Sequence, residues 1–258
     1  MATTRILVSN DDGYQAEGLR SLAEAMSSLG EVWVVAPESE QSATSHAISL
    51  HRPLRIREVS PRWYAVDGTP TDCSYVGINH LMKDDPPRIM LSGINSGPNL
   101  ADDVFYSGTV AAAMEASIFG VPAIAFSLAT RRDFDFRSGA RFAQRLVEAA
   151  LGQELPREML LNVNIPGGVE PDGYVVTRLG RHRYGSDVVE KLDPRGRKYY
   201  WIGGSEYDFE DIPGTDCYVV LHDRRVSVTP MQRDLTDDRV RALVARWPVR
   251  GYTRAGPD

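Results

Sequence analysis

Apolar and polar positions alternate with two different periods along the first two thirds of the chain. Apolar runs of strand length occupy residues 6–8, 31–37, 88–91, 122–126 and 160–165. Helical spacing of apolar residues separates them, at residues 19–29, 73–82, 109–116 and 136–151. Shorter strand-like pieces lie between residues 54 and 66. This alternation predicts an α/β fold with a Rossmann-like, doubly wound and mostly parallel sheet.

The pattern changes after about residue 166. Short strand-like runs follow one another at residues 174–178, 199–202, 218–221 and 226–229, with glycine, proline and charged residues between them and no helical spacing. This pattern predicts antiparallel structure, including a projecting hairpin. Helical spacing returns at residues 236–247. We therefore expect an α/β catalytic core at residues 1–170, and C-terminal strands, a hairpin and a terminal helix at residues 171–258.

Composition narrows the class of protein. The chain has 258 residues, of which 42% are apolar and 25% charged, which is typical of a globular domain with a sizeable core. The net charge of -6 argues against a surface for polymeric nucleic acid, but not against single nucleotides. Cys73 and Cys217 are the two cysteines, too few for a disulfide scaffold or a zinc-cysteine site.

The N-terminal residues give an expectation about location. They run straight into the first predicted strand, and no apolar run approaches the length of a membrane span. We expect a cytoplasmic protein with no membrane partner.

Two adjacent carboxylates, Asp11 and Asp12, follow the first predicted strand and precede Gly13. In an open α/β sheet, ligands bind at the carboxyl ends of the strands. Two acids at that edge repel each other unless a positive group lies between them, and a hard divalent cation is the simplest such group. The alternative is that one of the two acids only caps the following helix.

Further oxygen ligands follow other predicted strands. Ser42 lies beyond the second strand and Asn95 beyond a later one. Carboxylate, hydroxyl and amide oxygens suit magnesium, manganese or calcium better than zinc. The alternative for Ser42 and Asn95 is hydrogen bonding within their loops. Signature motifs of dinucleotide-binding proteins, P-loop NTPases, serine hydrolases and HExxH zinc enzymes are absent from the sequence.

Ser107, Gly108 and Thr109 precede an alanine-rich helix. Small residues at a helix start expose backbone N–H groups, and the helix dipole favours an anion such as phosphate there. The alternative is plain N-capping by Ser107 or Thr109. A cation site and an anion site together indicate metal-assisted phosphoester hydrolysis.

At these residues the sequence resembles the SurE family, the stationary-phase survival proteins, which are metal-dependent nucleotidases. The matching motifs lie at residues 9–13, 35–37 with Ser42, 68–72, 92–99 and 106–115. The resemblance implies hydrolysis of nucleoside 5′- and 3′-monophosphates, with some activity on short polyphosphate. It implies self-association as a dimer or tetramer, in which the C-terminal hairpin and helix are exchanged between subunits. Family members commonly have Ser-Gly-Ala where this chain has Ser42-Ala43-Thr44.

The resemblance also implies the site residues and the cofactor. One divalent cation per subunit, Mg²⁺ or Mn²⁺ with Ca²⁺ able to occupy the same place, would be held by Asp11, Asp12, Ser42 and Asn95. Phosphate contacts would come from Asn99, Ser107, Gly108 and Thr109. Asp11 and Asp12 would be the catalytic residues, holding the ion and orienting or deprotonating the attacking water, or acting as nucleophile. The preferred base is not readable from the sequence.

Two other functions remain open on the sequence alone. A receiver-like switch also carries acidic residues at a strand end, but it needs a phospho-acceptor Asp at another strand end. Ser92 and Asn95 stand at that place here. A nucleotide-binding protein without turnover would bind its ligand and release no phosphate.

Overall fold

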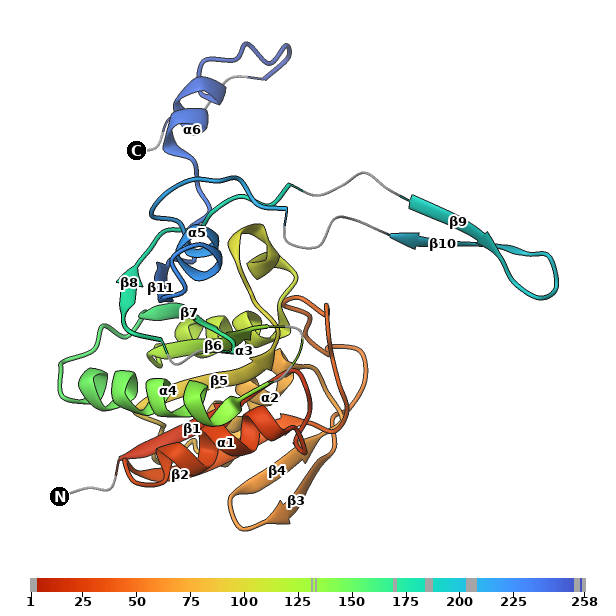
Figure 1. Ribbon diagram of the computed structural model, residues 1–258. Coiled ribbons are helices and arrows are strands. Elements are labelled where there is room, and N and C mark those ends of the chain that lie inside the picture. The colour runs from red at the N-terminus through yellow and green to blue at the C-terminus, as the bar shows by residue number, and fades with distance from the viewer. Residues whose placement is uncertain are drawn as a thin grey trace.

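Nine strands form one sheet through the centre of the molecule, in the order β3-β4-β2-β1-β5-β6-β7-β11-β8 (Figure 1). This computed structural model describes residues 4–130, 132, 134–168, 171–183, 188–202, 208–252 and 256. The strands of the sheet are β1 Arg5–Ser9, β2 Glu31–Pro37, β3 Ile56–Ser60, β4 Trp63–Val66, β5 Ile89–Ser96, β6 Ala123–Ala129, β7 Leu160–Pro166, β8 Tyr174–Val176 and β11 Val226–Met231.

Most strand pairs are parallel, which confirms the predicted fold class. β1 pairs in parallel with both β2 and β5, and β5, β6 and β7 continue in the same direction. β3–β4 and β7–β11 are the antiparallel pairs of the sheet. Because β2 and β5 lie on opposite sides of β1, the strand order reverses there. This reversal creates the crevice at the carboxyl ends of β1 and β5 in which α/β proteins bind ligands.

Helices cover both faces of the sheet (Figure 1). α1 Glu17–Met26 and α4 Phe136–Leu151 pack together on one face, whereas α2 Pro70–Val76 and α3 Gly108–Ile118 pack together on the other. The π-helix η1 Gly77–Leu81 continues α2.

Successive side chains of a strand point to opposite faces, and this divides the core into two layers. Ile6 and Val8 of β1 pack in the cluster that includes the buried side of α1 and α4. Leu7 between them packs in the cluster that includes α3. A continuous apolar run is therefore what a strand covered on both faces requires.

The C-terminal part contributes β8 and β11 to the edge of the same sheet. It also forms the separate antiparallel hairpin of β9 Val188–Leu192 and β10 Lys198–Ile202, which projects from the core, and the terminal helix α6 Asp238–Val244 (Figure 1). The predicted hairpin and terminal helix are confirmed.

One predicted strand is wrong. Residues 218–221 belong to the helix α5 Asp216–Leu221. Tyr218, Val219 and Val220 have high strand propensity, but tertiary contacts override such preferences. Asp216 lies in the first turn of α5, where its negative charge suits the helix dipole. Val219 and Val220 of the same helix are buried.

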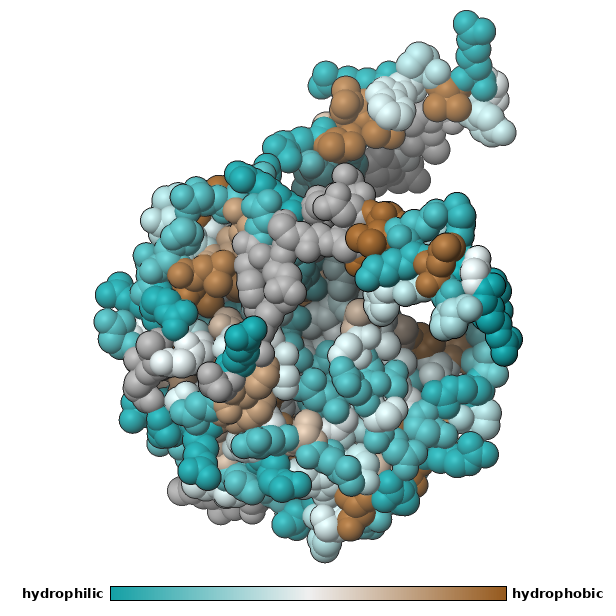
Figure 2. Space-filling view, turned by 45° about the vertical axis from the view of Figure 1, so that its right-hand side comes forward, coloured by the Kyte–Doolittle hydropathy of each residue, from teal (hydrophilic) through white to brown (hydrophobic). Residues whose placement is uncertain are grey.

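The hairpin and α6 leave large apolar side chains exposed. Figure 2 shows apolar residues on the projecting C-terminal part, above a core whose visible face is mostly hydrophilic. On the hairpin, Trp201 is 62% exposed and Ile202 is 93% exposed. Two ion pairs lie within the hairpin, Arg197 with Asp193 and Lys198 with Glu190. No helix in the described residues is long and apolar enough to span a membrane.

Candidate functional site

A polar cavity of about 320 Å³ lies at the carboxyl ends of β1 and β5. The structure brings six of the eight predicted site residues into its lining: Asp11, Asp12, Ser42, Asn95, Asn99 and Ser107. Gly108 and Thr109 are buried and do not line this cavity. The sequence did not indicate four further polar lining residues, Glu40, Ser96, Asp103 and Tyr106.

Residues at the start of α3 fix the position of the Asp11 side chain. Its side chain is buried, and the Thr109 hydroxyl donates a hydrogen bond to Asp11 Oδ1. Gly108 permits this approach, because a Cβ at that position would lie only 2.8 Å from the Asp11 Cβ. Ser107 caps the helix by accepting a hydrogen bond from the Val110 amide at 3.1 Å. The motif of residues 107–109 therefore both caps α3 and fixes Asp11.

Burial raises the pKa of Asp11 from its ordinary 3.8 to about 6, against the opposing hydrogen bond from Thr109 and with a further rise from the Asp12 charge. The folded pKa lies above the unfolded one, so the native state binds this proton more tightly. The metal-free protein is therefore expected to lose stability as the pH rises from about 4 to about 7, by up to roughly 3 kcal/mol from this group.

Asp11→Asn tests this expectation. In chelator at about pH 7.5, the variant should unfold at higher urea than the wild type, and near pH 4 this advantage should disappear. A variant that is less stable than the wild type in chelator at the higher pH would contradict the prediction.

Asp12 lies at the cavity wall and is held by β5. Its Oδ2 accepts hydrogen bonds from the Ser96 amide at 3.2 Å and the Ser96 hydroxyl at 3.1 Å. Burial raises the pKa of Asp12, and the Glu40 charge adds to the rise. The two acids differ, therefore, in that Asp11 is fixed in the interior whereas Asp12 is part of the accessible surface.

Asn95 and Ser42 supply uncharged oxygens. The Asn95 amide nitrogen donates to the Gly97 carbonyl at 2.9 Å, which leaves Oδ1 as its ligand atom. The Ser42 hydroxyl donates to Glu40 Oε1 at 2.7 Å, so its oxygen lone pairs are directed elsewhere. Both side chains thus have an oxygen available to a cation.

The charge of the cavity favours a cation. Asp11, Asp12, Glu40 and Asp103 all line it, whereas its described lining contains no lysine or arginine. A phosphate dianion entering this cavity would be repelled unless a positive ion accompanied it. Within the described ranges, no three Asp, Glu, His or Cys side chains converge to hold an ion by themselves. The donor set that fits is therefore mixed, two carboxylates with the neutral oxygens of Ser42 and Asn95.

Asn99 is fixed by polar residues of β6 and β7. Its side-chain amide donates to the Ser127 hydroxyl at 2.7 Å, and its backbone N–H donates to Asn164 Oδ1 at 2.8 Å. Its carbonyl accepts from Asn162 at 2.7 Å and from Asn164 at 2.9 Å. These supporting hydrogen bonds were not predicted from the sequence. Two asparagines two residues apart in an otherwise apolar strand were the signal, since both face the same side.

Ala43 stands at the position where the resemblance implies glycine, and its φ is +58°. Left-handed backbone is costly for a residue with a Cβ. We expect Ala43→Gly to stabilise the protein by roughly 0.5–1 kcal/mol, because it relieves this cost. Ala47 lies in the same loop without a positive φ, so Ala47→Gly should destabilise it instead. Urea unfolding measures both, and a destabilised Ala43→Gly variant would refute the explanation.

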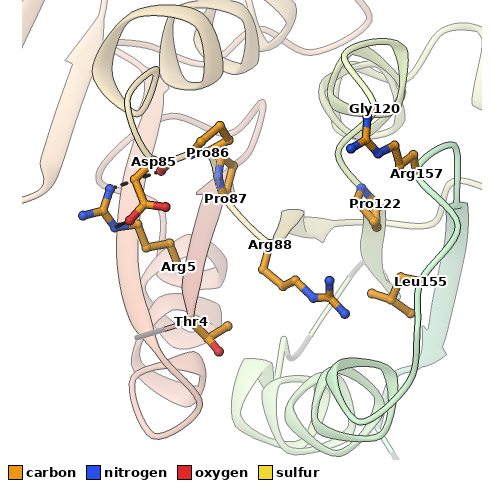
Figure 3. Close-up of a pocket in the computed structure, with 10 residues that line it drawn as sticks. All are labelled: Thr4, Arg5, Asp85, Pro86, Pro87, Arg88, Gly120, Pro122, Leu155 and Arg157. Atoms are coloured by element: carbon orange, nitrogen blue, oxygen red, sulfur yellow. Dashed lines mark hydrogen bonds and ion pairs between the residues drawn. The ribbon is translucent and has the colours of Figure 1, made fainter. Parts of the chain in front are cut away.

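A separate hollow, of about 420 Å³, lies at the amino ends of the strands, away from the acidic cavity (Figure 3). Arg5, Arg88 and Arg157 line it, and Figure 3 shows Arg5 turned toward Asp85, with which it forms an ion pair at 3.3 Å. It contains none of the predicted site residues and lies at the amino ends of the strands. The acidic cavity is therefore the better candidate for the functional site.

Known proteins of one family are similar to this chain over almost its whole length. The sequence model of the family described as Survival protein SurE matches residues 6–186. The chain is 68% identical over 254 residues to 5′-nucleotidase SurE of Myxococcus xanthus, covering 98% of this chain and 97% of the relative. It is 50% identical over 247 residues to 5′-nucleotidase SurE of Geobacter sulfurreducens, covering 95% and 94%. A crystal structure of the SurE protein from Aquifex aeolicus matches with a TM-score of 0.84 at 40% identity, covering 93% of this chain and 98% of that one.

Proposed function

The chain belongs to the survival protein SurE family and is a nucleotidase, and we propose that it hydrolyses nucleoside 5′-monophosphates with a divalent cation held in the acidic cavity. The resemblance predicted from the sequence motifs is confirmed. One observation carries the proposed cation requirement. Four carboxylates and no basic side chain line the described cavity that would receive a phosphate.

Asp11, Asp12, Ser42 and Asn95 would hold the cation through oxygen atoms, and Mg²⁺ or Mn²⁺ fits this hard donor set best. A bound divalent cation supplies charge neutralisation and polarises the phosphoryl group. Thr109 fixes the Asp11 carboxylate, and Ser96 fixes one oxygen of Asp12. Both acids are thereby preorganised, which avoids reorganisation at the moment of reaction.

The chain's own groups have distinct proposed roles in the hydrolysis. Asp12, at the cavity wall, would orient the attacking water and accept its proton. Ser107 and Asn99 line the same cavity and would bind the phosphate oxygens through hydroxyl and amide groups. In this scheme Thr109 does not contact phosphate directly, because its hydroxyl donates to Asp11.

We propose in addition that 3′-monophosphates and short polyphosphate are accepted. Support comes from the cavity, whose acidic and polar lining would act on a cation and a phosphoryl group, which all three substrates share. Phosphate release from 5′-AMP, 3′-AMP and tripolyphosphate, measured on one preparation, tests this. Release from 5′-AMP alone would restrict the proposal to the 5′-ester, and binding without release would favour the non-catalytic alternative.

The exposed apolar hairpin supports a proposal about assembly. We propose that it docks on a second copy of the chain, giving a dimer or tetramer, because large contiguous apolar surfaces mark interaction sites. The Trp201→Ser, Ile202→Ser double variant should then be a monomer in light scattering, whereas Lys191→Ser on the same hairpin should leave the wild-type mass unchanged. A wild type that is itself monomeric at micromolar concentration would overturn this proposal.

We also propose a cytoplasmic location. Cys73 and Cys217 are free buried thiols, and a reducing compartment keeps thiols in this state.

A further inference from the structure

A second cavity, of about 210 Å³, adjoins the acidic one and shares Ser107 with it. We propose that this cavity receives the nucleobase of the substrate while the phosphate occupies the acidic cavity. The assignment rests on the proposed function, since it supposes that nucleoside monophosphates are the substrates. Together the two cavities fall within the size range of ordinary small-molecule sites.

The same two chain segments build both cavities. In the loop after β2, Ser42 and Ala43 line the acidic cavity, whereas Ser45 and His46 line the second one. The segment formed by the 3-10 helix η2 Ala101–Phe105 and the residues after it is divided in the same way. Its residues 103 and 106 line the acidic cavity, its residues 104 and 105 line the second, and Ser107 lines both.

Two hydrogen bonds hold these segments together. The Ser45 amide donates to the Tyr106 carbonyl at 3.1 Å, and the Ser45 hydroxyl donates to the Phe105 carbonyl at 2.6 Å. The spacing between the two cavities is therefore fixed by the backbone. A nucleoside monophosphate, with a phosphate at one end and a flat base at the other, would place one end in each cavity.

The lining of the second cavity is mostly apolar and suits the faces of a base. Phe105 lines this cavity and is 56% exposed, although it is a large aromatic side chain. Ala111 and Met114 of α3 also line it. Aromatic rings and thioethers pack favourably on flat π systems. Stacking of this kind tolerates every base, because each base has a π face.

Polar side chains also line this cavity and could contact the edge of a base or a ribose. His46 Nε2 contacts Glu115 Oε2 at 2.7 Å, and Glu115 is 7% exposed, so this pair fixes the histidine ring. Gln232 and Arg233, from the segment after β11, also line the cavity. The C-terminal part of the chain thereby contributes to substrate binding as well as to the proposed assembly.

The test compares two phosphate esters, 5′-AMP and ribose 5-phosphate, which lacks the base. The measured quantity is the ratio of their kcat/KM values. Phe105→Ala, at an exposed position, should lower this ratio roughly tenfold, mainly by raising KM for AMP. Ala111→Leu, which fills the cavity, should lower it as well. Phe119→Ala, exposed beyond the other end of α3 and outside the cavity, is the matched control and should keep the wild-type ratio.

Two results would overturn the assignment, and they differ from each other. If the wild type hydrolyses both esters and the ratio stays within about twofold of the wild-type value in folded Phe105→Ala protein, the base does not bind here while the proposed function stands. If the wild type releases phosphate from neither ester, the proposed function fails and the assignment fails with it.

Discussion

Asp12→Asn is expected to lower kcat for 5′-AMP hydrolysis by at least about a hundredfold while the protein stays folded. Asparagine keeps an oxygen that can accept the two hydrogen bonds from Ser96, so the local geometry is retained. It removes a negative cation ligand and the proposed proton acceptor. Removing this charge also removes the cost of burying it and its repulsion with Glu40, both of which raise the pKa of Asp12. Stability should therefore not fall.

Steady-state phosphate release with Mg²⁺ or Mn²⁺, together with a thermal unfolding curve, measures both parts of this prediction. Glu38→Gln is the matched control, because Glu38 is an acidic residue of the same region that pairs with Arg57 at 2.8 Å and does not line the cavity. It should turn over like the wild type. Turnover of Asp12→Asn within about threefold of the wild type would remove Asp12 from the mechanism.

Asp216→Ala is expected to cost at least about 3 kcal/mol of folding free energy. The Asp216 carboxylate is fully buried and accepts three backbone hydrogen bonds, from the amides of Ala101, Gly180 and Cys217, each at 2.8 Å. Burial raises its pKa in spite of these donors. Alanine would leave three amides unsatisfied in the interior, and each such group costs roughly 1–3 kcal/mol.

The same variant should also affect the site. Ala101 begins η2 in a left-handed conformation, with φ at +50°, and η2 leads directly into the segment that carries Tyr106 and Ser107. We expect a fall in the melting temperature of roughly 6–12 °C, with a lower kcat/KM for AMP. Asp223→Ala, an exposed acidic position just beyond α5, should stay within about 0.5 kcal/mol of the wild type. A wild-type melting temperature for Asp216→Ala would show that these three bonds do not contribute.

The convergence of the candidate site residues was predictable from one rule of the α/β fold. The candidate residues come from three segments that lie far apart along the chain. Asp11, Asp12 and Ser42 follow β1 and β2, as predicted, whereas Asn95 lies within the last residues of β5, which is longer than the predicted strand at residues 88–91. Parallel strands bring their carboxyl ends to one edge, so the four residues meet in one cavity. Helix and strand positions in the core were equally readable, as the predicted helix at residues 136–151 and α4 illustrate.

What sequence could not predict depends on tertiary contacts. Thr109 was expected to face a phosphate, but it donates to Asp11, because α3 approaches β1 closely at Gly108. The support of Asn99 by two asparagines of β7 needs the spatial order of the sheet, which periodicity does not give. The helix α5 replaces a predicted strand for the same reason. Its start is fixed by contacts of Asp216 with residues distant in sequence.

The acidic cavity is proposed to hydrolyse phosphate esters only when it holds a cation. The most direct test of this requirement is phosphate release from 5′-AMP by wild-type protein that has been stripped with chelator and then supplied with Mg²⁺ or Mn²⁺. We expect the stripped protein to be folded and to release phosphate at less than about a hundredth of the rate with cation, and the added cation to restore that rate. Full turnover by the stripped protein, with chelator still present, would contradict this requirement.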